Sequence, residues 1–173
     1  MSIFSSDSAE FAPILRSSCP EDLSRLWRLD RICFEPGIAY SRQQLRRFLA
    51  IPGAESVLAE AHGELTGFAI GYRDGPDLAR VVTLDVDPAF RRRGLGQRLL
   101  DALLARLAAS GATRALLEVD VRNSGAIAFY RRLGFAESGR LPSYYGRGLD
   151  ALEMTRTMSE ESNLARGEPR TEY

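Results

Sequence analysis

The 173-residue sequence contains no lysine, and arginine supplies all 23 of its basic side chains. Without lysine the chain cannot form a Schiff base, use a lysine nucleophile or bind phosphate with a P-loop lysine. A preference for arginine codons is the simplest source of this composition. The absence therefore narrows the chemistry without indicating a function.

Histidine and cysteine are almost as scarce. The one histidine, His62, lies in the sequence Ala61-His62-Gly63-Glu64, which is typical of a hairpin turn. One histidine in a turn supports neither a Ser-His-Asp triad nor a multi-histidine zinc site, so we expect no metal. Two cysteines, Cys19 and Cys33, are too few for a disulfide scaffold, and we expect both to pack in or beside the first helix.

Long hydrophobic runs and an excess of charge of one sign are also missing. No apolar stretch approaches the ~20 residues of a membrane-spanning helix, and the first twenty residues do not resemble a signal peptide. The 23 basic and 23 acidic side chains cancel, whereas a nucleic-acid-binding domain is usually strongly basic. We therefore expect a reduced, cytoplasmic enzyme domain with no membrane or nucleic-acid partner; the oligomeric state stays open.

Polar ends flank one α/β (α+β) domain. We expect flexible tails over residues 1–10 and 158–173 and a single domain over 11–157. Hydrophobic periodicity, caps and turn residues predict helices from Pro20 to Phe34 (with Leu23, Leu26, Trp27 and Ile32 as its apolar stripe), Ser41 to Ala50, Leu95 to Ala109 and Asn123 to Leu133. Strands are predicted over 11–15, 56–61, 64–72, 80–86, 114–119, 135–140 and 151–157.

The turn before the third long helix is the strongest local signal. It reads Arg91-Arg92-Arg93-Gly94-Leu95-Gly96-Gln97 and joins a strand to a helix. Its glycines let backbone N–H groups approach a ligand, and the helix N-terminus favours anions. Three arginines would oppose that helix dipole unless a polyanion such as pyrophosphate lies there. A tight turn preceded by solvated charges is the alternative.

Together with later segments, this turn resembles the GNAT N-acetyltransferases. Arg91 to Gly96 is similar to their acetyl-CoA pyrophosphate loop, Arg/Gln-x-x-Gly-x-Gly/Ala. The stretch containing Leu117-Glu118-Val119, Asn123, Phe129-Tyr130 and Leu133-Gly134-Phe135 resembles the RimI-type ribosomal-protein alanine N-acetyltransferases. The resemblance covers about residues 11–157. It implies a mixed, mostly antiparallel sheet with helices on both faces and a cofactor cleft between the splayed strands 81–86 and 114–119.

The resemblance also implies residue roles. The backbone of Leu84, Asp85 and Val86 would hold the acetyl-pantetheine arm, the loop Arg91, Arg92, Arg93, Gly94, Leu95, Gly96 and Gln97 the pyrophosphate, and Asn123 the pantetheine. Glu118 occupies the position of the family's general base and Tyr130 that of its general acid. This suits acetyl transfer, since a carboxylate can take the amine proton and a tyrosine can donate to sulfur. Tyr144 and Tyr145 resemble the substrate-side aromatic loop, although Leu149 interrupts its usual acidic continuation.

Several of these residues have simpler interpretations. Glu118 could form an outward salt bridge, Tyr130 could be core packing, and Asn123 could cap a helix. Asp85 and Asp120 depart from the family pattern, and we hypothesise that one of them binds the substrate ammonium group. The alternative is that one pairs with a nearby arginine.

The expected acceptor is a protein or peptide N-terminus, possibly of a ribosomal protein. An α-amine titrates near ~7.8 and lysine near ~10.4, so neutralising lysine costs about 3.5 kcal/mol more. This difference favours an N-terminal acceptor. The alternatives are a small-molecule or lysine acetyltransferase, a non-catalytic acyl-CoA-binding module, and a nucleic-acid binder using Arg91 to Arg93.

Overall fold

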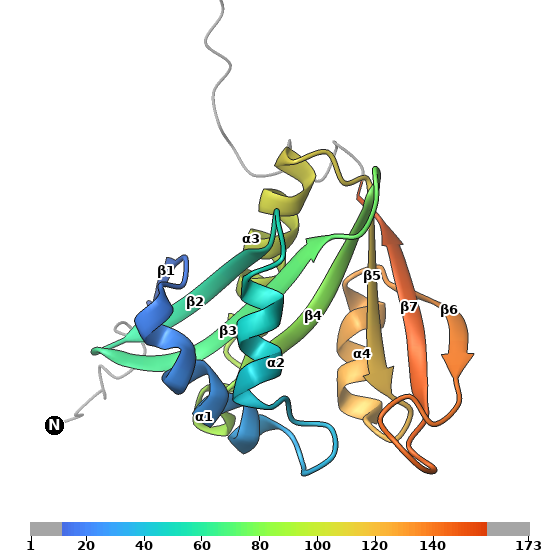
Figure 1. The fold of residues 1–173 in the computed structure, drawn as a ribbon, viewed down its shortest axis with the longest axis horizontal. Coiled ribbons are helices and arrows are strands. Elements are labelled where there is room, and N and C mark those ends of the chain that lie inside the picture. The colour runs from blue at the N-terminus through green and yellow to red at the C-terminus, as the bar shows by residue number, and fades with distance from the viewer. Residues whose placement is uncertain (1–11, 159–173) are drawn as a thin grey trace, which may run out of the picture.

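The computed structural model describes residues 12–158 as a single sheet with helices on both faces (Figure 1). The two predicted tails, apart from Met158, lie outside the described residues, as does Phe11 at the start of the first predicted strand. The strands are β1 (Ile14–Arg16), β2 (Glu55–Ala61), β3 (Glu64–Arg73), β4 (Leu78–Val86), β5 (Arg114–Asp120), β6 (Ala136–Leu141) and β7 (Ala151–Thr157). The helices are η1 (Pro20–Asp22), α1 (Leu23–Cys33), α2 (Arg42–Leu49), η2 (Pro88–Phe90), α3 (Leu95–Ala109) and α4 (Ser124–Arg132).

The strand order is β1-β2-β3-β4-β5-β7-β6, which confirms the predicted mixed sheet. Every neighbouring pair is antiparallel except β4 and β5, which run parallel. These two strands pair only where Leu78–Val81 lies beside Arg114–Leu117. Beyond that point they separate, and the sheet opens between them as Figure 1 shows.

A β-bulge in β4 accompanies this separation. Ile70 of β3 pairs with Thr83 and Gly71 pairs with Val81, so Val82 is an extra residue in β4. Val81 packs into the core beneath α3, whereas Val82 packs against the core beneath α1 and α2. Because a bulge redirects the side chains that follow it, the later half of β4 presents different residues to each face than strict alternation would.

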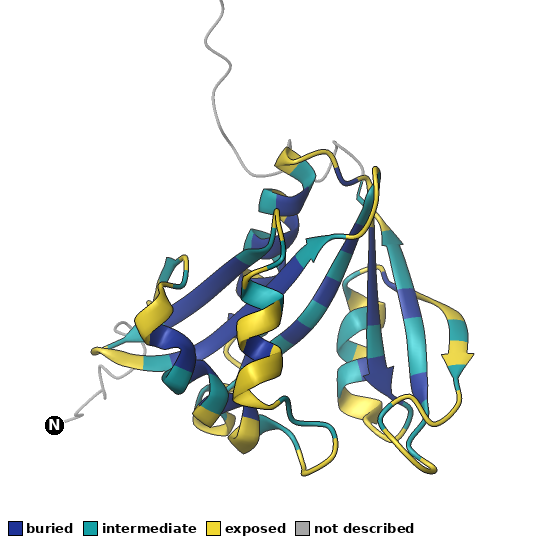
Figure 2. Cartoon of the chain, viewed as in Figure 1, coloured by how far each residue is buried: buried dark blue, intermediate teal, exposed yellow. Residues whose placement is uncertain are grey.

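Two hydrophobic cores lie on opposite faces of the sheet (Figure 2). The leucines of α3, predicted from their helical spacing, are buried in the larger core: Leu95, Leu99, Leu100, Leu103, Leu104 and Leu107. The smaller core joins Leu26 of α1 and Leu45 of α2 to Phe68 of β3. Ile32 was predicted on the apolar stripe of α1, and that prediction is wrong: the residue is 61% exposed because it lies on the outer side of the helix.

Local signals set the ends of the helices as predicted. The Ser41 hydroxyl accepts from the Gln44 N–H at 3.2 Å, and the Gln44 side chain accepts from the Ser41 N–H at 2.8 Å, which completes the capping box of α2. The Asn123 side chain accepts from the Ala126 N–H at 3.0 Å and caps α4. Among the helices of the described chain, none combines the length and apolar content that crossing a lipid bilayer requires.

Candidate active site

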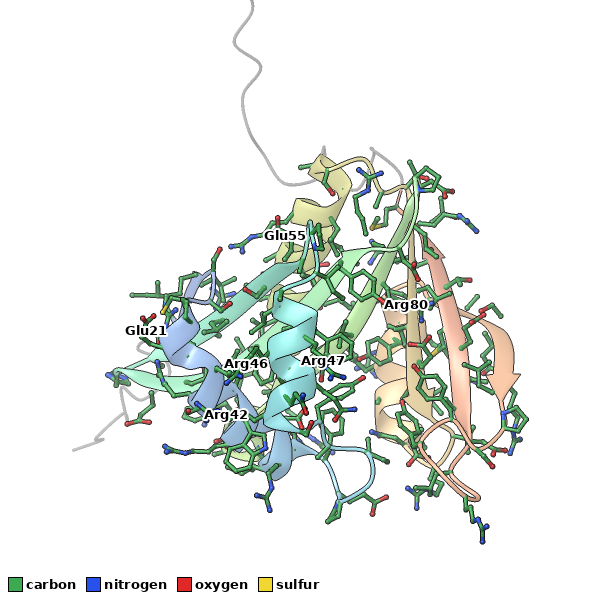
Figure 3. All side chains as sticks on the ribbon, viewed as in Figure 1. Glu21, Arg42, Arg46, Arg47, Glu55 and Arg80 are labelled. Atoms are coloured by element: carbon green, nitrogen blue, oxygen red, sulfur yellow. The ribbon has the colours of Figure 1, made fainter. Side chains whose placement is uncertain are left out.

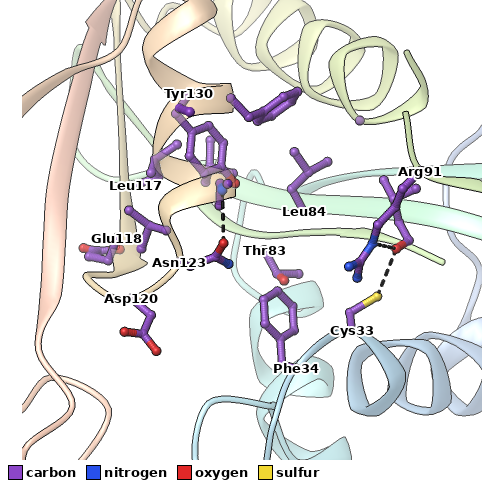
Figure 4. A pocket seen from close by; sticks show the side chains of 18 of the residues that line it. Cys33, Phe34, Thr83, Leu84, Arg91, Leu117, Glu118, Asp120, Asn123 and Tyr130 are labelled. Carbon is purple, nitrogen blue, oxygen red and sulfur yellow. Dashed lines mark hydrogen bonds between the residues drawn. The ribbon is translucent and has the colours of Figure 1, made fainter. Parts of the chain in front are cut away.

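A cleft of about 1460 Å³ occupies the gap where β4 and β5 separate (Figure 4). One part of its wall comes from the arginine-glycine loop, the start of α3 and α4. Another part comes from the α1–α2 connection and from Tyr145 in the β6–β7 loop. Because these two sets belong to opposite faces of the sheet, the cleft runs through the sheet from one face to the other.

The loop before α3 is shaped for close approach by a ligand. Gly94 caps the helix with φ 75°, and Arg92 has φ 61°, both in the left-handed region where glycine is preferred. Arg91 donates from Nε to the Val86 carbonyl at 2.9 Å, which anchors the loop to the end of β4. The first N–H groups of α3 thus face a cleft that is also lined by Arg91 and Arg92, an arrangement suited to a diphosphate.

The predicted loop residues do not all reach the cleft. Gly94, Leu95, Gly96 and Gln97 line it with Arg91 and Arg92. Arg93 is not among the lining residues, and its guanidinium lies 5.9 Å from the centre of the Phe90 ring. The three arginines therefore divide into two that face the cleft and one that packs on an aromatic ring.

Asp85 does not lie where our substrate-binding hypothesis requires. Leu84 and Val86 line the cleft, but Asp85 is fully buried on the other side of β4, beneath α1. Its carboxyl accepts from the Thr83 hydroxyl at 2.5 Å, and burial raises its pKa well above the ordinary value. The bulge at Val82 and the alternation of the strand turn it away from the cleft, so an ammonium group there cannot meet it.

Asp120 lies at the cleft, but its carboxylate is already paired with an arginine. Arg122 donates from its backbone N–H at 2.9 Å and from its guanidinium at 2.5–3.1 Å, and the same guanidinium also contacts Glu35. This hydrogen bonding lowers the pKa of Asp120. The structure thus matches the alternative in which Asp120 pairs with a neighbouring arginine.

Glu118 lies at the cleft, as the predicted general base should, and it also forms the salt bridge that was the alternative. The strand β5 places its side chain at the cleft with only 9% exposure, next to the point where β4 and β5 separate. Arg80 of β4 forms an ion pair with Glu118 and also donates from Nε to Asp74 at 2.9 Å. The ion pair joins the two strands at the vertex of the split and fixes the direction of the Glu118 carboxylate.

Tyr130 is held by an aromatic cluster on α4 at the cleft wall. Its ring meets Phe129 and Phe135 edge-on, with centroids 5.2 and 5.8 Å away. Burial, and to a smaller extent the negative charge of Asp85, raises the pKa of its hydroxyl. The phenol therefore keeps its proton at neutral pH and can donate a hydrogen bond into the cleft, which it lines together with Asn123.

The tyrosine pair of the β6–β7 loop is split between cleft and surface. Tyr145 lines the cleft, whereas Tyr144 is 45% exposed and does not. Their rings pack edge-on at 4.9 Å, and Leu149 accepts from the Tyr145 N–H at 3.0 Å. Tyr144 nevertheless lies near Glu118: partial burial and, after it, the Glu118 carboxylate raise the pKa of its hydroxyl, so the structure brings both tyrosines to the site, Tyr145 in the cleft wall and Tyr144 at its edge.

The α1–α2 connection supplies a wall of the cleft that the sequence did not predict. Cys33, Phe34, Ile38 and Tyr40 line the cleft there, and the Tyr40 hydroxyl donates to the Val82 carbonyl at 3.4 Å. Cys33 donates from its thiol to the Val86 carbonyl at 3.4 Å, while Cys19 is exposed at the start of η1 and so does not pack as expected. The helix break at Glu35-Pro36-Gly37 was the only signal for this wall. Within residues 12–158 no three His, Cys, Asp or Glu residues are grouped to hold a metal.

Comparison with known proteins matches this architecture to one family. The model of the acetyltransferase (GNAT) family matches residues 23–135. The N-alpha-acetyltransferase RimI of Mycobacterium tuberculosis is 38% identical over 131 residues, which cover 73% of this chain and 78% of that protein. An uncharacterised protein of Mycobacterium leprae is 36% identical over 152 residues, covering 83% of this chain but only 40% of its own length.

Solved structures show the same fold. The ribosomal-protein-S18-alanine N-acetyltransferase of Escherichia coli superposes with a TM-score of 0.75 at 25% identity, covering 94% of this chain and 99% of that one. NAA60 of Arabidopsis thaliana, solved in complex with acetyl-CoA, superposes with a TM-score of 0.74 at 23% identity, covering 85% and 99%.

Proposed function

Because the chain belongs to the acetyltransferase (GNAT) family, we propose that it moves acetyl from acetyl-CoA to the α-amino group of a protein or peptide. One observation carries this proposal: a cleft that crosses the sheet has an anion-binding loop at one end and both Glu118 and Tyr130 along its walls. A donor and an acceptor can therefore enter from opposite faces and meet between β4 and β5.

Acetyl-CoA fits the end of the cleft near α3. The diphosphate would accept from the first N–H groups of α3 and from Arg91 and Arg92. The pantetheine arm would lie along the edge of β4 at Leu84 to Val86 that the separation from β5 leaves without a strand partner, although the Val86 carbonyl already accepts from Arg91 and Cys33. The Asn123 amide would contact the arm from α4, while its carbonyl oxygen stays on the helix cap.

The cleft residues support direct transfer without a covalent enzyme intermediate. The neutral amine attacks the thioester carbonyl, a C–N bond forms and the C–S bond breaks. The amine proton passes to Glu118, directly or through water, and the departing sulfur takes a proton from Tyr130. Burial raises the pKa of Tyr130, so its hydroxyl is protonated at neutral pH and has a proton to give.

An α-amine is the acceptor we favour. An α-amine is already partly neutral near pH 7.8, so one ion-paired carboxylate suffices to take the proton that the nitrogen gives up during the reaction. The relatives named for N-alpha-acetylation and for a ribosomal-protein alanine support the same choice. A ribosomal-protein N-terminus beginning with alanine is therefore the first acceptor to test.

An acceptor screen tests the proposal. The purified chain is given acetyl-CoA with peptides of varied N-termini, the same peptides blocked at the N-terminus, polyamines and aminoglycosides, and thiol release is measured. We expect release with free N-terminal peptides and none when the α-amine is blocked. Thiol release with polyamines or aminoglycosides alone would show that the acceptor is a small-molecule amine and not a peptide. Binding of acetyl-CoA without any thiol release would indicate a non-catalytic acyl-CoA-binding module.

A further inference from the structure

Five arginines gather on one helical surface that the proposed reaction leaves unexplained. Arg28 and Arg31 of α1 and Arg42, Arg46 and Arg47 of α2 are all exposed. Within residues 12–158 none of the five forms an ion pair with an acidic side chain, whereas the exposed Arg114, Arg131 and Arg140 elsewhere do. We call these five residues the arginine face.

The two helices place like charges next to one another. The pairs Arg28–Arg31 and Arg42–Arg46 have i,i+3 and i,i+4 spacing, at which like charges repel and weaken a helix. Arg42 also donates to the Ser24 hydroxyl of α1 at 3.0 Å, which brings the two helices together. Figure 3 shows Arg42 and Arg46 on the side of α2 that faces α1, and Arg47 on the other side of the same helix.

No exposed acid on either helix relieves this repulsion. The exposed positions of α1 are Arg28, Arg31 and Ile32, and those of α2 are arginines and glutamines. The acid of α1, Asp30, is fully buried and faces the core. A surface that keeps repelling charges together without internal compensation is suited to an anionic partner.

The arginine face lies on the acceptor side of the sheet. The helices α1 and α2 cover the face opposite α3, and their connection supplies the cleft wall that includes Phe34 and Tyr40. The donor is proposed to enter from the α3 side, so an acceptor chain has to leave the cleft on the α1–α2 side. In an extended chain each residue adds about 3.3 Å, so the segment that follows the first few acceptor residues can reach these helices.

We propose that the arginine face binds an acidic segment of the acceptor protein, just downstream of the N-terminal residue that is acetylated. This inference rests on the proposed function and narrows its substrate class. Ile32, 61% exposed, and Trp27, which lies 5.1 Å beneath the Arg31 guanidinium, add apolar contact for the side chains of a polypeptide. A nucleic acid fits less well, because the chain as a whole has no net positive charge.

Three peptides test this inference. They share the same alanine N-terminus and first three residues, and their next positions carry glutamates, glutamines or arginines. We expect kcat/KM to fall in that order, and the glutamate-to-glutamine ratio to shrink as sodium chloride screens the exposed charges. In the double variant Arg46→Gln/Arg47→Gln this ratio should fall by about threefold to tenfold, the size expected for two exposed charge contacts.

Arg114→Gln is the matched control, since Arg114 is an exposed arginine that belongs to neither α1 nor α2: it is the first residue of β5. The glutamate-to-glutamine ratio should keep its wild-type value in this variant. Thermal unfolding of every variant checks that the fold is intact, and all of these substitutions are on the surface.

The remaining outcomes separate the two proposals. Equal kcat/KM for the three peptides, unchanged in the double variant, would overturn the acidic acceptor and leave N-terminal acetylation standing. Acetyl-CoA binding with no turnover of any peptide would overturn both. Tighter binding of a single-stranded RNA than of the glutamate peptide, lost in the double variant, would assign the arginine face to nucleic acid and overturn the inference.

Discussion

At the scale of single residues, the ion-paired Glu118 is the first side chain to vary. Replacing Glu118 with Gln removes the proton acceptor but keeps the shape of the side chain. We expect kcat to fall by about 10²-fold at neutral pH, within the range for general bases, and by more at lower pH, where fewer amines are already neutral. The measurement is the pH profile of kcat with an alanine-starting peptide.

Glu137→Gln is the control, because Glu137 is an acid on β6 whose arginine partner, Arg131, lies away from the cleft. Its profile should overlay that of the wild type. If Glu118→Gln also overlays the wild type at every pH, another group or solvent removes the proton.

Tyr130 separates acid catalysis from packing. Phenylalanine keeps the edge-on contacts with Phe129 and Phe135 and removes only the hydroxyl. We expect Tyr130→Phe to lower kcat by roughly 10-fold to 10²-fold while the Kd for acetyl-CoA, measured by calorimetry, changes less than twofold. A large increase in that Kd at unchanged kcat would make Tyr130 a cofactor contact instead.

Asp30 and Asp85 form a buried acidic pair beneath the cleft. Both are fully buried, and in the described chain Asp30 Oδ1 and Asp85 Oδ2 have no hydrogen-bond partner. Burial raises the pKa of Asp30 to about 6, and the Tyr40 N–H opposes this only in part. Because the unfolded chain loses the same proton near pH 4, stability is greatest below that pH and falls as pH rises to about 6.

Asp30→Asn should remove the part of this pH dependence that Asp30 contributes, while the part from the buried Asp85 remains. The amide oxygen can still accept from the Tyr40 N–H, which lies 2.7 Å from the carboxylate, and no charge is buried. At pH 8 we expect the variant to be more stable by up to about 3 kcal/mol, with little difference at pH 4. Urea unfolding at both pH values measures it, and a variant less stable at pH 8 would show that the ionised Asp30 is stabilising.

At the scale of elements, Asn123 has two proposed roles that different substitutions separate. Asn123→Ala removes the cap of α4 and should cost about 1 kcal/mol of stability. Asn123→Asp keeps an oxygen for the Ala126 N–H but loses the amide donor, so stability should be preserved while the Kd for acetyl-CoA rises several-fold. Unchanged Kd in both variants would limit Asn123 to capping.

The elements themselves follow closely from local sequence signals. The leucine spacing of 95–109 and the capping box at Ser41 set helices whose predicted ends agree with the structure. Ile32 and Asp85 could not be placed in the same way. Whether Ile32 faces the core depends on how α1 lies on the sheet, and the side of Asp85 depends on the bulge at Val82, which no turn residue marks.

At the scale of the whole molecule, the cleft depends on contacts between segments distant in sequence. Arg80 and Glu118 meet only because β4 and β5 are neighbours, and Tyr40 and Tyr145 reach one cleft from two separate loops. The resemblance to GNAT enzymes placed Glu118, Tyr130 and the glycine loop at this cleft. Hydrophobic periodicity and turn residues do not predict such long-range pairings. An ion pair was an alternative for Glu118 and for Asp120 from the sequence, but the α1–α2 wall and the identity of the partners, Arg80 and Arg122, came only from the structure.

The sheet is weakest where this cleft opens, and a ligand there should stabilise the whole chain. Only Leu78–Val81 and Arg114–Leu117 pair β4 with β5, so within the sheet a short parallel ladder joins the half that contains β5, β6 and β7 to the rest, and the core beneath α3 adds side-chain packing between them. Coenzyme A bound along β4 and at the start of α3 and α4 would contact both halves. At a concentration of 100 times Kd we expect about 2.7 kcal/mol of added stability, measured as a rise in Tm, with slower hydrogen exchange in β4 and β5.

Gly94→Val, which places a β-branched side chain at φ 75°, should abolish most of this rise, because the loop can no longer hold the diphosphate. A full Tm rise in Gly94→Val would mean that coenzyme A binds away from the loop, and the donor site proposed here would then be wrong.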